Sequence, residues 1–95
     1  MIIAEVSVVP VGAGTSVSKY VREGIRALES SGLRTQTNAM ATDIEAKSID
    51  EIFAAVKSAH LAVLGAGAQR VLTTLKIDDR IDKEATMESK VNAVR

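Results

Sequence analysis

The chain has 95 residues, 46% of them hydrophobic but only 2% aromatic, and its 12 basic and 12 acidic side chains leave no net charge. A chain of this length forms one domain, residues 1–95, and the balanced charge and scarcity of aromatic side chains disfavour nucleic-acid binding. The sequence has no cysteine and no apolar run near the roughly 20 residues of a membrane span, so we expect a cytoplasmic protein without a membrane partner.

Residues 2–11 are predicted to form a strand, because β-branched side chains alternate along them. One face is apolar throughout and the other is mixed, the mixed face comprising Ile3, Glu5, Ser7 and Val9. The acidic Glu5 and the lack of a basic segment before it favour a strand over a signal peptide. Pro10 and the glycines that follow end the strand.

A helix is predicted next, because apolar side chains recur at three- and four-residue steps from Val17 to Leu28. Thr15 or Ser16 is its expected N-cap, and Gly32 occupies the left-handed position after its end. A glycine inside the helix, residue 24, indicates close packing on the sheet.

The remaining elements complete a βαββαβ order. Residues 33–40 and 42–46 are predicted as strands joined by a tight connection at Asn38 and Ala39. Ser48 and Glu51 form a capping box that opens a second helix, residues 70–78 alternate as a fourth strand, and residues 83–95 have helical spacing. This order predicts an α+β, ferredoxin-like fold: a four-stranded antiparallel sheet with two helices on one face, plus a C-terminal helix.

Such helices leave the other sheet face uncovered. Strand alternation assigns to it a mixture of aliphatic, hydroxyl and charged side chains, among them Glu5, Asp43, Glu45 and Lys76. Glu5 and Lys76 are expected to pair across the two central strands. A mixed face suits a pocket partly buried between subunits, so the sequence predicts a small-molecule binder that self-associates to a homo-oligomer.

Three other features are weighed as sites. The loop at residues 12–16 precedes a helix and has either a turn-and-cap role or a phosphate-contacting one, but it lacks the P-loop ending. Asp78, Asp79 and Asp82 form either an ion-paired turn, the favoured interpretation, or a metal site. His60 lies beside the apolar stripe of the second helix. No nucleophile motif or catalytic carboxylate pair is present, so we expect no enzyme activity and no metal or catalytic cofactor.

Three stretches together resemble one family: residues 4–12 with 16–21 (AEVSVVPVG, SVSKYV), residues 38–46 (NAMATDIEA) and residues 70–80 (RVLTTLKIDDR). The family is that of the small thiamine-binding proteins. The resemblance implies a ferredoxin-like fold, assembly into dimers and tetramers through the sheets, and non-catalytic binding of thiamine or its hydroxymethylpyrimidine portion. Where the family often has glycine, this chain has Ala41 and Ala46, and the added methyl groups narrow a pocket or alter a turn.

The resemblance and the strand alternation together give a set of candidate ligand residues. Glu45 is expected to bind the aminopyrimidine, and Met40 is expected to cover the rings. The uncharged polar side chains of the set are expected to supply further hydrogen bonds. The full predicted set is Ser7, Ser18, Asn38, Met40, Thr42 and Glu45. The alternatives are a regulatory or scaffold oligomer without a thiamine ligand and, less favoured, an enzyme acting on a thiamine precursor.

Overall fold

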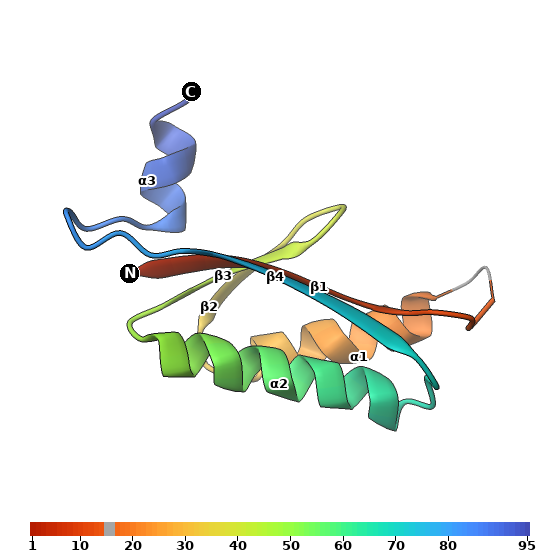
Figure 1. Ribbon diagram of the computed structural model, residues 1–95. Helices are drawn as coiled ribbons and strands as arrows, with labels where there is room; N and C mark the ends of the chain where they lie inside the picture. Colours follow the sequence, from red (N-terminus) through yellow and green to blue (C-terminus); the bar gives the residue numbers. More distant parts are fainter. Residues whose placement is uncertain (15–16) are drawn as a thin grey trace.

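The computed structural model describes residues 1–14 and 17–95, and these form a four-stranded antiparallel sheet with two long helices on one face (Figure 1). The elements follow in the order β1 (Ile2–Pro10), α1 (Ser18–Glu29), β2 (Arg34–Thr37), β3 (Thr42–Ala46), α2 (Ile49–Gly65), β4 (Val71–Asp78) and α3 (Met87–Asn92). The strands lie side by side as β2-β3-β1-β4. This is the predicted ferredoxin-like α+β fold with a short C-terminal helix added.

Local signals explain where the helices begin. Ser48 is the N-cap of α2, and its Oγ accepts the Glu51 N–H at 3.3 Å, which is one half of the predicted capping box. The Glu51 carboxylate accepts from the Ser48 hydroxyl at 3.1 Å instead of from the Ser48 N–H. At α1 the N-cap is Val17, which makes no side-chain cap. The predicted caps Thr15 and Ser16 lie outside the described residues.

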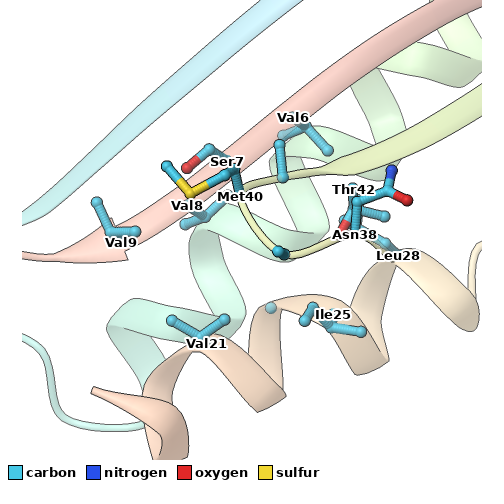
Figure 2. Close-up of a pocket in the computed structure, with 13 residues that line it drawn as sticks. Val6, Ser7, Val8, Val9, Val21, Ile25, Leu28, Asn38, Met40 and Thr42 are labelled. Atoms are coloured by element: carbon cyan, nitrogen blue, oxygen red, sulfur yellow. The ribbon is translucent and has the colours of Figure 1, made fainter. Parts of the chain in front are cut away.

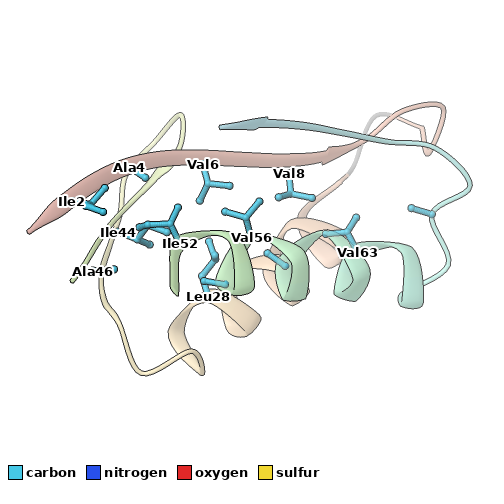
Figure 3. Packing of buried hydrophobic residues seen from close by; sticks show 13 residues of the cluster. Ile2, Ala4, Val6, Val8, Leu28, Ile44, Ala46, Ile52, Val56 and Val63 are labelled. Atoms are coloured by element: carbon cyan, nitrogen blue, oxygen red, sulfur yellow. The ribbon is translucent and has the colours of Figure 1, made fainter. Parts of the chain in front are cut away.

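The core lies between the sheet and the pair α1 and α2, and its side chains are aliphatic (Figure 3). The predicted apolar face of β1 is buried in full, namely Ile2, Ala4, Val6 and Val8. Gly24 brings α1 close to α2, because a Cβ built there would lie 3.1 Å from Cγ2 of Val63. Its nearest contact is therefore the other helix rather than the sheet.

The third helix lies on the opposite face of the sheet, near the N-terminal end of β1 (Figure 1). Met87 in its first turn is buried, whereas its C-terminal part points away from the sheet. Val94, just beyond the helix, is 85% exposed. No helix in the described part of the chain is long and apolar enough to cross a membrane.

Two predictions about the strands need correction. The second strand ends at Thr37 rather than residue 40, because residues 38–41 turn and the Asn38 N–H donates to the Ala41 carbonyl at 2.9 Å. Lys76 is opposite Glu5 in register, but β4 is an edge strand, so the pair does not join two central strands. The ion pairs between described residues do not include these two side chains.

Candidate functional site

A pocket of about 180 Å³ opens at the edge of β1, where β3 turns away from it (Figure 2). The helix α1 lines it from below, β1 forms one wall, and the turn at residues 38–41 forms the other. The contribution of α1 is apolar: Val21, Gly24, Ile25 and Leu28. We call this cavity the edge pocket.

Four of the six predicted ligand residues line the edge pocket: Ser7, Asn38, Met40 and Thr42. They come from β1, the turn and the first residue of β3, so the fold joins segments distant in sequence. Thr42 is buried, whereas Met40 is 89% exposed and lies at the rim. Ser18 is exposed in the first turn of α1 and does not line the cavity.

Glu45, the sixth predicted residue, is committed to contacts inside the fold. It faces the predicted side of the sheet, but α3 covers it and leaves it 4% exposed. Its Oε2 accepts the buried Met87 N–H at 2.9 Å, and its Oε1 lies 3.7 Å from Nε of Arg34. Glu45 lines neither the edge pocket nor the larger cavity between the sheet and α3. Its carboxylate therefore joins β3 to the start of α3.

A second cavity, of about 670 Å³, lies between the open sheet face and α3. We call it the open-face groove. Its apolar wall includes Met87 and Val91 of α3. Its sheet side carries Glu5 and Asp43, which occupy directly opposed positions on neighbouring strands. Like charges placed this way repel each other, and the neighbouring cation of the groove is Lys76, opposite Glu5 on β4.

Of the other charged side chains in the groove, Lys90 and Asp78 are paired, whereas Lys76 lies opposite Glu5 on β4 and takes part in none of the ion pairs between described residues. Lys90 donates a hydrogen bond to Asp78, and this contact together with the lysine charge lowers the pKa of that carboxyl. Asn38 donates from Nδ2 to Oδ2 of Asp43 at 3.1 Å. Asn38 lines both cavities, so the two open next to each other.

The two cavities are adjacent, an arrangement that suits a molecule with two small rings. Ser7 lines the edge pocket and Glu5 lines the groove. They lie two residues apart on one face of β1, a spacing of about 7 Å along an extended strand. A ligand can thus place a neutral ring beside Ser7 and a cationic ring beside Glu5.

The remaining candidates are engaged elsewhere. Asp82 forms an ion pair with Arg80, which lowers the pKa of the Asp82 carboxyl. The described residues contain no group of three or more metal-ligating side chains. His60 Nδ1 lies 2.6 Å from Oγ1 of Thr73, which links α2 to β4. In the loop at residues 12–16, Gly12 and Gly14 have positive φ and residues 15 and 16 lie outside the described part.

Sequence reasoning missed two contributions to these cavities. Val21 and Ile25 were expected only as packing residues of a helix, yet they line the edge pocket. Glu5 and Asp43 were placed on the open face but not proposed as ligand groups. Strand alternation predicted that Glu5 and Asp43 lie on the open sheet face. That they lie directly opposite each other depends on the register between β1 and β3, which the sequence does not show. Of the two alanines at family glycine positions, Ala41 lines the edge pocket, whereas Ala46 is buried in the core.

Comparison with known proteins agrees with the fold of this chain. A family model described as "Thiamine-binding protein" matches residues 4–95. A UPF0045 protein of Methanothermobacter thermautotrophicus is 47% identical, over 100% of this chain and 97% of that protein. The solved structure of hypothetical protein MJ1052 from Methanocaldococcus jannaschii matches with a TM-score of 0.91 at 47% identity, covering 98% of this chain and 94% of that one. A Bacillus cereus domain of unknown function, DUF77, matches with a TM-score of 0.88 at 33% identity, covering 99% of this chain and 89% of that one.

Proposed function

The chain belongs to the thiamine-binding protein family, and from this premise we propose that it binds thiamine, or the hydroxymethylpyrimidine part of thiamine, without catalysing a reaction. The observation that carries the proposal is the edge pocket. It brings Ser7, Asn38 and Thr42 together over an apolar helix surface. A few fixed polar groups within apolar walls are typical of a small-molecule site.

The size of the edge pocket favours one ring. Pockets for drug-sized ligands enclose about 300–1,000 Å³, and the edge pocket has about 180 Å³. The aminopyrimidine is the neutral, hydrogen-bonding ring of thiamine, so it is the half that fits these walls. Hydroxyl and amide groups of the pocket supply donors and acceptors for its nitrogens.

The thiazolium ring then lies in the open-face groove. The ring carries a fixed positive charge, and Glu5 and Asp43 supply carboxylates on that side of Asn38. A cation there relieves the repulsion between the two opposed carboxylates. Each exposed contact of this kind is worth up to about 1 kcal/mol, so the charge contributes to orientation more than to affinity.

A binding role without catalysis is supported by the pocket lining. None of the described residues that line the edge pocket has a titratable side chain. A ring bound there contacts no general acid or base from those residues. The ring in the edge pocket is therefore held rather than converted, and the carboxylates of Glu5 and Asp43 act on the other ring as opposite charges.

Self-association through the open face is part of the same proposal. Leu72 on this face is 59% exposed, and Val91 in α3 and Val94 just after it are also exposed on the same side of the sheet. Large exposed apolar groups on a short chain are typical of an interaction surface. Light scattering after size exclusion is expected to give a dimer or tetramer, and a monomer at micromolar concentration would refute this part.

Calorimetric titration with thiamine and with hydroxymethylpyrimidine tests the ligand. Asn38→Ala is expected to weaken thiamine binding about tenfold, because a hydrogen bond is worth about 1 kcal/mol and its neighbour Asp43 loses a partner. Asn92→Ala, at the end of α3 and outside both cavities, is the matched control. Absence of binding of either compound to the wild-type protein would favour the alternative, a scaffold oligomer without a thiamine ligand.

A further inference from the structure

The edge of β1 is only partly used by its neighbours. On one side β1 pairs with β4 along its length as far as Pro10, opposite Val71. On the other side it pairs with β3 only as far as Val6, opposite Thr42. The residues that precede Thr42, and that would lie opposite Ser7 and Val8 if the pairing continued, instead form the turn at residues 38–41. In the described part of the chain, the last residues of β1 thus have no strand partner on this side.

The register shows which peptide groups face the unpaired side. The Val11 N–H donates to the Arg70 carbonyl at 2.8 Å, continuing the β1–β4 ladder. In an antiparallel ladder the residues that exchange hydrogen bonds with one neighbour alternate with those that face the other way. The peptide groups of Ser7 therefore face β4, and the N–H and C=O of Val8 face away from it.

An independent hydrogen bond on the other side of the sheet gives the same result. The Asn38 N–H donates to the Ala41 carbonyl at 2.9 Å, so Asn38 and Ala41 form a hydrogen-bonded pair of the β2–β3 ladder. By the same alternation, Thr42 turns its peptide groups toward β1, where its partner is Val6. The next position with this orientation on β1 is Val8, which lines the edge pocket.

Val8 is a buried residue, and its outward-facing peptide groups have no partner among the described residues. Val8 is 9% exposed. Among the described residues, neither the strand pairings nor the loop hydrogen bonds supply a partner on its free side. Buried backbone N–H and C=O groups are nearly always paired with protein, water or ligand. One donor and one acceptor, side by side at the wall of a pocket, thus point to a bound molecule with the complementary pair.

We infer that the Val8 N–H and C=O recognise the amino-substituted edge of a pyrimidine. In a 4-aminopyrimidine a ring nitrogen, which accepts, is adjacent to an amino group, which donates. The Val8 N–H donates to that ring nitrogen, and the Val8 carbonyl accepts from the amino group. The inference rests on the proposed function and names the groups that recognise the ligand. The edge pocket selects a pyrimidine with an amino group through the backbone of β1.

Replacing the amino group of the ligand by oxygen tests the inference without altering the protein. The 4-oxo analogue of thiamine, oxythiamine, presents an acceptor and a ring N–H where thiamine presents a donor and an acceptor. Both hydrogen bonds to Val8 are then mismatched. A site built for hydrogen bonding rejects such an analogue strongly, so calorimetry is expected to show oxythiamine binding at least about 100-fold more weakly than thiamine. Equal affinities would overturn the inference and leave the proposed function intact, whereas absence of binding of both thiamine and hydroxymethylpyrimidine would overturn both.

Amide hydrogen exchange of the ¹⁵N-labelled protein locates the contact. The Val8 amide is expected to exchange at least tenfold more slowly when the protein is saturated with thiamine. The amides of Val6 and Ser7 are the matched controls, because strand neighbours already pair them, and their rates are expected to change much less. Saturation with thiamine that leaves Val8 exchange unchanged would also overturn the inference.

Discussion

Glu45→Ala removes the carboxylate that fastens α3 to the sheet, and the structure allows its cost to be worked out. In the wild-type protein Oε2 accepts the buried Met87 N–H at 2.9 Å. A hydrogen bond to a charged group contributes about 1.5–3 kcal/mol, and its loss leaves a buried N–H without a partner. The contact with Arg34, at 3.7 Å on a side chain 61% exposed, adds little.

The expected loss in the free energy of unfolding is therefore about 2 kcal/mol. In a domain of this size such a loss lowers the melting temperature by roughly 8–16 °C. Thermal and urea unfolding followed by circular dichroism measure both quantities. Glu45→Gln is the matched control, because its side-chain carbonyl still accepts from Met87. We expect its loss in the free energy of unfolding to be less than half of the loss in Glu45→Ala.

Thiamine binding by the folded variant separates this role from the ligand role that the sequence suggested for Glu45. If Glu45 only holds α3, calorimetry at a temperature where Glu45→Ala is folded is expected to give an affinity within about threefold of wild type, which is less than the loss of one hydrogen bond. Unchanged stability combined with a loss of binding would refute the reasoning and make Glu45 a ligand residue.

Two further perturbations test the packing and the charges. Gly24→Ala is expected to destabilise the protein by about 1 kcal/mol in urea unfolding, because crowding of Val63 at 3.1 Å outweighs the gain in helix propensity; equal or higher stability would contradict the close helix contact. Lys90 lowers the pKa of Asp78 from its ordinary value of 3.8, so the pair stabilises the fold above that pH and the contribution disappears as the pH falls through the lowered pKa. Asp78→Asn is expected to be less stable than wild type at neutral pH and equally stable in strong acid. If the difference in the free energy of unfolding between the two proteins does not change with pH, the Lys90–Asp78 pair is not its cause.

Much of the fold follows from local patterns. Alternation along β1 predicted its buried face, and Ser48 with Glu51 predicted the start of α2. These signals depend on residues within one strand or one helical turn, so a sequence displays them directly. The polar segment at residues 33–40 gave a weaker signal, and the observed β2 is shorter because the turn begins at Asn38.

The candidate site depended on relations that no local pattern contains. Ser7, Asn38 and Thr42 were named from a family resemblance, and the fold brought them to one cavity. Glu45 was placed on the correct face, but its neighbours come from α3, more than 40 positions further along the chain. A short C-terminal helix can lie on either face of a sheet, and its own sequence did not indicate which.

The sequence by itself determined a small α+β domain with an aliphatic core and an open, mixed sheet face, because strand and helix periodicities decide which side chains become buried. Only the tertiary structure decided where β3 leaves β1, and with it which peptide groups of β1 stay unpaired beside the edge pocket. Strand register is set by pairing between distant segments, and the peptide N–H and C=O are the same in every residue except proline. The composition of a strand therefore cannot indicate that Val8 is the residue whose backbone remains free to bind a ligand.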